Sequence, residues 1–453
     1  MANVFPLDRP CARVPYNPRR FPAPGVSPAM TDCDLLIVHA EELATPAGRG
    51  PRRGAAQDEL LVLRDAALAV QRGRIAAVGP TAEIEAAWRA RVRHDARGSF
   101  VVPGFVDAHT HPAFVATRER EYDLRLRGVG YEEITRRGGG IFRSVDDLRA
   151  APDDVLAACL RGHLRGFLAA GTTTVECKSG YGLTWRDERR SLELLAREAA
   201  ALPLRVVPTF LGAHQMPREF RERRADYVRE LAKEMLPEVK RLGLARYCDV
   251  FCDVGAFTVE EARAVLQAAR DLGLGLRIHA EELGPSGGAR LAAELGAASA
   301  DHLIHADDAA IDAMGAAGVT PVLLPGTVFA LAKSAPPARK MIARGLPVAL
   351  ATDFNPGTSY LQSPLLLLSL ACAVLRLTIA EALTAATANA AASLGLADEC
   401  GALLPGLSAD AVLIRGTSHQ LLGYRLAEGP IERVLCRGQL LDPRAFGPFA
   451  SAA

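Results

Sequence analysis

The chain has 453 residues, which is too long for one ordinary domain and suits one large barrel with a smaller module. Apolar residues make up 49% and charged residues 23%, as in soluble globular proteins, and a net charge of +1 excludes a whole-protein field that attracts nucleic acid or membranes. Nine cysteines without a Cys-x-x-Cys pair and the absence of an apolar run of roughly 18 residues predict a cytoplasmic protein without disulfides or a membrane span.

The first 30 residues are rich in Pro and Arg and lack the apolar core of a secretory signal. This composition predicts a disordered tail. Met30 stands just before the first strand pattern, so residues 1–29 are either a natural flexible tail or an upstream extension of the chain.

Short apolar runs separated by turn residues occupy residues 35–102 and return at residues 409–415 and 431–441. Such closely spaced runs are typical of short β-strands. Two β-rich ends that flank an α/β middle predict one small composite β-sandwich domain built from both termini. We therefore expect sandwich segments at residues 31–102 and 399–453, and a barrel at residues 103–398.

In this middle part, apolar strand patterns alternate with helical patterns, for example at residues 153–170, 186–201, 220–242 and 258–272. Eight strands are expected to end near His109, Lys178, His214, Asp253, His279, His302, Leu324 and Asp353. This alternation predicts an α/β fold, a (β/α)8 TIM barrel. Several of these strands end in a titratable residue, and the carboxyl ends of the strands form the active-site face of such a barrel.

Two histidines, His109 and His111, follow the first barrel strand in the motif PGFVDAHTH. In an extended segment residues i and i+2 point the same way, so both imidazoles can face one metal ion. His279 follows the fifth strand and Asp353 the eighth. Three histidines and an aspartate predict a mixed nitrogen and oxygen site for zinc or iron. For the histidine pair alone, two solvated turn residues are the alternative, which the other two strand ends disfavour.

One Zn2+ or Fe3+ ion per subunit is favoured over two, because no lysine that could be carboxylated to bridge two metals ends the fourth strand. That strand ends with Phe251, Cys252 and Asp253. Lys178 ends the second strand instead, where we expect it to form a salt bridge or hydrogen bonds.

Glu282 lies three residues after His279 and is the candidate to take a proton from water or to hold the ring nitrogens of a substrate. Its neighbour Glu281 is the alternative, which we expect to face solvent. His302 ends the sixth strand and is a second candidate for proton transfer, with a buried structural histidine as the alternative.

At these residues the chain resembles the amidohydrolase superfamily, and its motifs resemble those of the imidazolonepropionase family within it. The motifs are HTHPAFVATRERE, YEEITRRGGGI, GTTTVECKSGYGL, PTFLGAH, IHAEELGPSGG, SADHL and ATDFNPGTS, in that order over residues 34–441. The resemblance implies metal-dependent hydrolysis of the cyclic amide of 4-imidazolone-5-propanoate to N-formimidoyl-L-glutamate in histidine degradation. It also implies a homodimer.

The resemblance carries roles to single residues. It implies that His109, His111, His279 and Asp353 are metal ligands and that Glu282 and His302 are the catalytic pair. The residues that it matches to substrate binding are Arg118, Tyr181, His214, Glu282, Asn355, Gly357 and Thr358.

The chemistry of these side chains agrees with an anionic substrate. The guanidinium of Arg118 is a two-pronged donor that fits a carboxylate. Tyr181 lies between two glycines, so its hydroxyl can approach a ligand closely. The turn at residues 355–358 is expected to expose backbone N–H groups to a second carboxylate, although Asn-Pro-Gly is also common in plain turns.

Two other functions stay open. A hydrolase or deaminase of this fold that acts on a purine or pyrimidine does not need Arg118, Tyr181 and Asn355, because its substrate carries no carboxylate. A non-catalytic relative with a role in assembly is expected to lose metal ligands, and all four are present. We expect a small-molecule substrate and no nucleic-acid or membrane partner.

Overall fold

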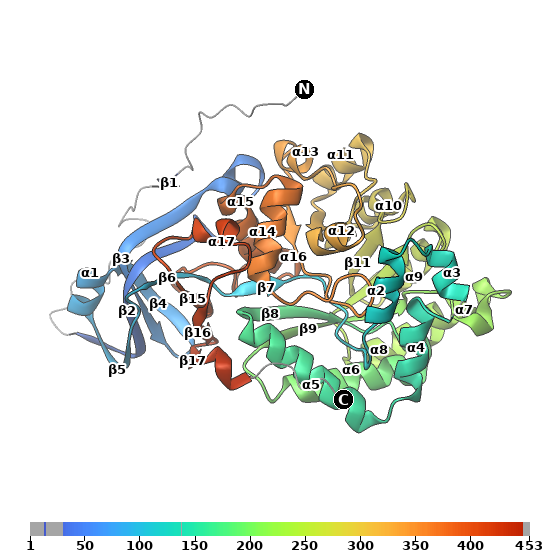
Figure 1. Cartoon of the computed structure of the whole chain (residues 1–453), viewed down its shortest axis with the longest axis horizontal. Coiled ribbons are helices and arrows are strands. Elements are labelled where there is room, and N and C mark those ends of the chain that lie inside the picture. The colour runs from blue at the N-terminus through green and yellow to red at the C-terminus, as the bar shows by residue number, and fades with distance from the viewer. Residues whose placement is uncertain (1–12, 15–29, 137, 447–453) are drawn as a thin grey trace.

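The computed structural model describes residues 13–14, 30–136 and 138–446. Within them the chain forms a barrel of eight parallel strands and, beside it, a mixed sheet of nine strands (Figure 1). The tail expected at residues 1–30 lies outside the described residues, except for residues 13–14 and 30. None of the helices in the described ranges combines the length and the apolar character that crossing a bilayer requires.

The barrel strands follow one another in chain order and are all parallel. They are β7 (Phe105–Asp107), β8 (Thr172–Lys178), β9 (Arg205–Ala213), β10 (Tyr247–Cys252), β11 (Gly275–Ala280), β12 (Ser299–His302), β13 (Thr320–Leu323) and β14 (Ala349–Leu350). The predicted TIM-barrel fold is confirmed, because each strand ends within a few residues of the position that the apolar pattern indicates.

The first and last strands approach each other and nearly close the barrel. A parallel bridge joins Thr110 to Phe354, just beyond the ends of β7 and β14. Asp107 strengthens this seam, since its carboxylate accepts hydrogen bonds from the Thr352 backbone N–H at 3.0 Å and from the Thr352 hydroxyl at 2.6 Å. The seam holds the segments that carry His111 and Asp353 side by side.

Helices cover the outside of the barrel, and most of those predicted are observed. They include α5 (Asp153–Ala169), α6 (Trp185–Ala199) and α9 (Val259–Asp271). Thr258 caps α9 in a capping box with Glu261, a local signal that fixes where the helix begins. The helix expected at 220–242 begins later, as α7 (Arg224–Glu230), and runs through a π-helical turn at Leu231–Met235 into α8 (Leu236–Leu242).

The remaining helices fill the loops between barrel strands or extend the outer layer. They are α2 (Glu119–Leu126), α3 (Tyr131–Arg136), α4 (Ile141–Ala150), α10 (Gly288–Leu295), α11 (Asp308–Ala317), α12 (Pro325–Ala330), α13 (Ala338–Ala343), α14 (Pro364–Leu375), α15 (Ile379–Thr384) and α16 (Ala390–Ser393). Helices α2, α3 and α4 all belong to the long connection between β7 and α5, so they lie on the side of the barrel where the strands end.

The second sheet combines strands from both ends of the chain. It contains β1 (Arg13–Val14), β2 (Thr31–Pro46), β3 (Leu60–Gln71), β4 (Arg74–Pro80), β5 (Trp88–Asp95), β6 (Ser99–Pro103), β15 (Ala411–Arg415), β16 (Ile431–Cys436) and β17 (Gln439–Leu441), with α1 (Thr81–Ala87) and α17 (Leu421–Tyr424) nearby in sequence. Antiparallel pairing of Val102 with Val412 joins the two ends. The expected β-rich domain from both termini is therefore confirmed, while its bounds at residues 31–102 and 399–453 stay a prediction.

Candidate active site and metal centre

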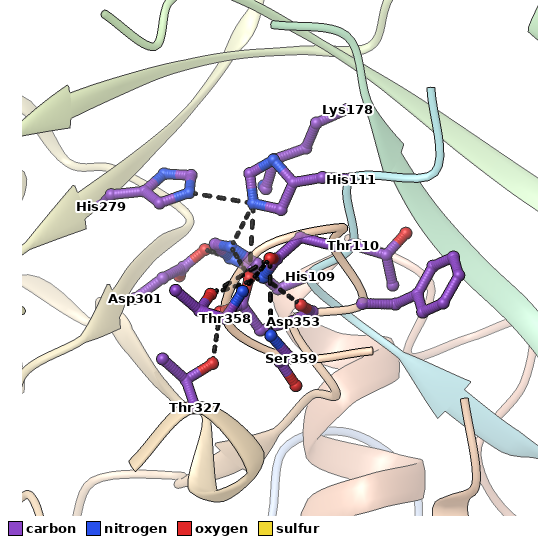
Figure 2. A network of polar contacts seen from close by, with 12 residues as sticks. His109, Thr110, His111, Lys178, His279, Asp301, Thr327, Asp353, Thr358 and Ser359 are labelled. Atoms are coloured by element: carbon purple, nitrogen blue, oxygen red, sulfur yellow. Dashed lines mark hydrogen bonds and ion pairs between the residues drawn. The ribbon is translucent and has the colours of Figure 1, made fainter. Parts of the chain in front are cut away.

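Four polar side chains converge where the barrel strands end (Figure 2). His109 and His111 follow β7, His279 lies on β11 and Asp353 follows β14. The Nε2 atom of His111 lies 3.1 Å from that of His109 and 3.3 Å from that of His279. Asp353 Oδ1 lies 3.6 Å from His109 Nε2 and 3.4 Å from His111 Nε2. Residues separated by up to 244 positions thus present their donor atoms to one point.

The spacing of these donor atoms fits a metal ion. Zinc binds imidazole nitrogen at about 2.0–2.1 Å in tetrahedral geometry, which places neighbouring donors roughly 3.3–3.4 Å apart. The four measured separations lie between 3.1 and 3.6 Å, on both sides of that value. All four residues are buried, and the three imidazoles form one of the described clusters with the geometry of a metal site.

Two buried carboxylates orient two of the three histidines through their Nδ1 atoms. Asp301 Oδ2 lies 2.6 Å from His109 Nδ1, and Asp249 Oδ1 lies 3.0 Å from His279 Nδ1. A carboxylate on Nδ1 fixes the ring and leaves Nε2 as the electron-pair donor. Sequence reasoning did not single out Asp249 or Asp301. The available signal was clear for Asp249, an acidic residue inside the otherwise apolar strand β10, which needs a buried partner.

Each of these carboxylates also faces a buried cation. Lys178 Nζ lies 2.8 Å from Asp249 Oδ2 and 2.9 Å from Glu176 Oε1, so the salt bridge expected of Lys178 is confirmed. Arg277 Nη2 lies 3.4 Å from Asp301 Oδ2. A fully buried charge is costly unless it is paired, and this pairing accounts for ionised groups deep inside the barrel.

The electrostatics favour the metal-binding protonation states of His109, His111 and Asp353. Burial by itself lowers the pKa of His279, but its contact with Asp249 raises that pKa above the ordinary value. Burial lowers the pKa of His111 to about 4 and holds the pKa of His109 well below its usual value, so both rings are neutral near pH 7. Burial by itself raises the pKa of Asp353, but its hydrogen bond to His111 and the nearby histidine charges hold it below the ordinary range. Neutral imidazoles and an ionised carboxylate are the ligand forms of these side chains.

Backbone geometry at the strand ends is unusual. Asp353 has φ of 53° and His302 has φ of 76°, in the left-handed region that non-glycine residues rarely adopt. The Thr327 hydroxyl at the start of α12 donates to Asp353 Oδ2 at 2.5 Å and holds the carboxylate in place. Strained backbone of this kind persists where the surroundings over-determine it, often at functional sites.

Glu282 and His302 lie together beside the cluster. His302 Nε2 is 3.7 Å from Glu282 Oε2, and both residues are buried. The expectation that Glu281 faces solvent is wrong, because only 4% of the residue is exposed. The chain turns at Glu281 with φ of 59°, and its carboxylate accepts hydrogen bonds from backbone N–H groups of Gly287 and Ala289, which pull it towards α10.

Two aromatic side chains form a wall next to His111. The His214 ring stacks on that of His111, with centroids 5.1 Å apart and planes at 20°. The Tyr181 ring lies 5.3 Å from that of His214. Glu188 fixes the loop that carries Tyr181, since its carboxylate accepts hydrogen bonds from three backbone N–H groups, those of Gly180, Gly182 and Leu183, at 2.8–2.9 Å.

Arg118 lies against the turn that follows Asp353. Its backbone N–H donates to Pro356 O at 3.1 Å, and a Cβ atom added to Gly357 would lie 1.9 Å from Arg118 Nη2. The prediction that this turn exposes free backbone N–H groups is wrong for Gly357 and Thr358. Their N–H groups donate to Asn355 Oδ1 at 2.8 and 2.7 Å. Asparagine side chains close such turns on themselves, which leaves the guanidinium of Arg118 as the charged donor beside this turn. Its Nε atom lies 3.3 Å from Glu121 Oε2.

Comparisons with known protein families match the barrel and the nine-stranded sheet with different family models. A model of the amidohydrolase family matches residues 100–441, and a model of the imidazolonepropionase-like composite domain of bacteria matches residues 66–90 in the nine-stranded sheet. Proteins named imidazolonepropionase from Symbiobacterium thermophilum and Solibacter usitatus are 47% and 46% identical to this chain. The matches cover 91% of this chain and 98% and 99% of those proteins.

Solved structures with low sequence identity share the fold. A zinc-bound adenosine deaminase from Xanthomonas campestris superposes with a TM-score of 0.70 at 20% identity, over 92% of this chain and 97% of that one. A guanine deaminase from E. coli superposes with a TM-score of 0.66 at 19% identity, over 90% and 98%.

A match that includes the whole barrel places the chain in the amidohydrolase family, and the chain is a hydrolase with a metal site. The chain is also nearly half identical in sequence to the two proteins named imidazolonepropionase, over about nine-tenths of its own length. The chain belongs to the imidazolonepropionase family.

Proposed function

We propose that the chain hydrolyses the cyclic amide of 4-imidazolone-5-propanoate to N-formimidoyl-L-glutamate, a step of histidine degradation. The observation that carries this function is the convergence of three histidine nitrogens and one carboxylate oxygen at the barrel mouth, 3.1–3.6 Å apart. The family to which the chain belongs supports the choice of substrate.

His109, His111, His279 and Asp353 are the proposed ligands of one Zn2+ or Fe3+ ion. A metal ion held by such donors acts as a Lewis acid that activates water at neutral pH. Asp301 and Asp249 orient two of the ligands through their Nδ1 atoms, at 2.6 and 3.0 Å. Conversion of the ring amide needs this activation because water itself is a poor nucleophile at pH 7.

Glu282 and His302 are proposed to move the protons. In the reaction the oxygen of water bonds to the ring carbonyl carbon, the ring C–N bond breaks, and the released nitrogen takes a proton. Glu282 accepts a proton from the attacking water. His302 transfers a proton to or from the oxygen on the tetrahedral carbon or the leaving nitrogen. Because His302 Nε2 and Glu282 Oε2 lie 3.7 Å apart, both side chains can contact the same amide group of the substrate.

The substrate is proposed to lie between the histidine cluster and the turn at residues 355–358. Arg118 binds the propionate arm, while Tyr181 and His214 line the ring on the side of His111. The loop residues Asn355, Gly357 and Thr358 border the end of the site that holds the product carboxylates, where Asn355 closes the turn and Gly357 leaves room for Arg118. A carboxylate beside an arginine gains a charged, two-pronged hydrogen bond.

The assembly and location of the enzyme are part of the proposal. We propose a homodimer in the cytoplasm, without nucleic-acid or membrane partners. The eight cysteines of the described residues are free thiols, which supports a reducing compartment for this proposal. Sedimentation velocity of the purified chain tests the dimer directly.

Product analysis in 18O-labelled water tests the reaction. Purified protein is incubated with freshly prepared 4-imidazolone-5-propanoate, and the product is identified by mass spectrometry and NMR. The proposal predicts N-formimidoyl-L-glutamate with the label in the newly formed carboxylate. Ammonia release from a purine or pyrimidine, with no turnover of the imidazolone, would instead assign the chain to the deaminase alternative.

A further inference from the structure

Lys333 stands at the rim of the site, in the segment after α12. Its backbone N–H donates to Val328 O at 3.0 Å, and the preceding Ala332 has φ of 50°, so the end of α12 is wound into a tight left-handed cap. From there the side chain reaches Glu282, on the loop that follows β11. The Lys333 side chain is 24% exposed.

The ammonium group of Lys333 contacts Glu282 twice. Nζ donates to the backbone carbonyl oxygen of Glu282 at 3.1 Å and lies 3.5 Å from its carboxylate Oε1. The other carboxylate oxygen, Oε2, lies 3.7 Å from His302 Nε2. Glu282 is therefore held between a rim cation on one oxygen and the interior histidine on the other.

A different residue fixes the backbone of this loop. The buried carboxylate of Asp253 accepts hydrogen bonds from the N–H groups of Glu282, Leu283 and Gly284 at 2.6, 3.0 and 3.2 Å. Because Asp253 makes three hydrogen bonds to this backbone, the loop keeps these anchors without Lys333. Lys333 adds one hydrogen bond to the Glu282 carbonyl oxygen and, through its contact with Oε1, a constraint on the direction of the Glu282 side chain.

We propose that Lys333 is a positioning residue that aligns Glu282 for proton transfer. This inference rests on the proposed role of Glu282. An ion pair that is partly exposed contributes little to stability, so the reason for a lysine here lies in the site rather than in the fold. Without the ammonium, Oε1 loses its partner and the carboxylate can rotate away from His302, with the backbone still held by Asp253.

Kinetics of a double-mutant cycle test the proposal. Lys333→Met is expected to lower kcat by about 10–100-fold, the scale of a misplaced catalytic group, with KM changed by less than about twofold. Lys333→Arg keeps the charge and should recover most of the loss. In a Glu282→Gln background, Lys333→Met should cost nothing further, because the group that it aligns is no longer a base.

The matched control is Lys340→Met, which removes a lysine paired with Asp308 at 2.6 Å on the outer surface. It should leave kcat, KM and metal content unchanged. Equal, multiplicative losses from Lys333→Met in both backgrounds would overturn the proposal, as would a higher KM at constant kcat, which marks a direct substrate contact.

A crystal structure of Lys333→Met separates this inference from the reaction itself. The proposal predicts that the Glu282 carboxylate turns away from His302 while the hydrogen bonds from the loop to Asp253 persist. An unmoved carboxylate would overturn the positioning role, whatever substrate the enzyme uses. If the wild-type protein does not hydrolyse the imidazolone but Glu282 does turn in the variant, the proposed function fails and the positioning role stands.

Discussion

The carboxylate of Asp301 lies 2.6 Å from His109 Nδ1, and both side chains are completely buried. This contact decides which nitrogen of His109 faces the other donors. With Nδ1 occupied, Nε2 points to His111 and Asp353 (Figure 2). In the candidate metal site, Asp301 and Asp249 thus form an outer layer behind two of the three histidines and orient their rings.

Weakening this outer layer should weaken metal binding. Asp301→Asn keeps the shape of the side chain but removes its charge from His109 and Arg277. We expect a loss of about 10–100-fold in metal affinity, the usual effect of changing a group behind a ligand. Competition against a chromophoric chelator measures this affinity, and circular dichroism checks the fold.

The surface residue Asp312 provides a control for charge. It pairs with Arg344 at 3.2 Å and is 65% exposed, so Asp312→Asn should bind metal as the wild type does. An Asp301→Asn protein with unchanged metal affinity would show that the contact with His109 has no part in ligand geometry.

Arg118→Lys should impair substrate recognition although the positive charge remains. A lysine offers a point charge in place of the planar fork that matches a carboxylate. The loss in kcat/KM should correspond to about 1.5–3 kcal/mol, typical of a charged hydrogen bond, and should appear mainly in KM. Steady-state kinetics with the imidazolone substrate measure it. Identical kinetics in the two proteins would rule out Arg118 as the carboxylate donor.

Gly357→Ala should cause part of the same defect in substrate binding, because the added methyl group would displace the Arg118 side chain. An added Cβ would lie 1.9 Å from Arg118 Nη2, and the end of a flexible side chain moves more easily than backbone. We expect Arg118 to be displaced, with KM raised and thermal stability nearly unchanged. The effect should vanish in an Arg118→Ala background, and additive effects in the double variant would contradict the displacement.

Glu282→Gln should lower kcat by at least about 100-fold with the metal still bound, because the shape stays while the base is lost. Glu281→Gln should leave kcat near the wild-type value, since that carboxylate faces the backbone N–H groups of Gly287 and Ala289 rather than the site. Steady-state kinetics and metal analysis on both variants check this. If kcat falls strongly in Glu281→Gln and stays at the wild-type value in Glu282→Gln, the two assignments are reversed.

The barrel and the convergence of the proposed metal ligands could be predicted from the sequence because both follow from local patterns. Apolar runs at regular spacing mark the strands, and a titratable residue at the end of a run falls at the shared mouth of the barrel. The short apolar runs at both ends likewise predicted that the two ends form one β-rich domain, and the pairing of β6 with β15 joins them.

The contacts that were missed depend on neighbours in space. Asp301 pairs in register with His279 on the adjacent strand, yet its carboxylate reaches across to His109, which lies 192 positions earlier. The direction of Glu281 depends on how its loop turns back onto α10. Asn355 captures the N–H groups of its own turn, which the motif alone does not distinguish from an open anion site.

The dependence of imidazolone hydrolysis on bound metal tests the central claim most directly. Turnover of freshly prepared 4-imidazolone-5-propanoate and metal content are measured on the same samples of wild-type and His111→Ala protein, before and after chelation. We predict hydrolysis in proportion to bound metal up to one ion per chain, loss on chelation, recovery when zinc or iron is restored, and no recovery in the folded His111→Ala protein. Full turnover by metal-free wild-type protein would contradict the account.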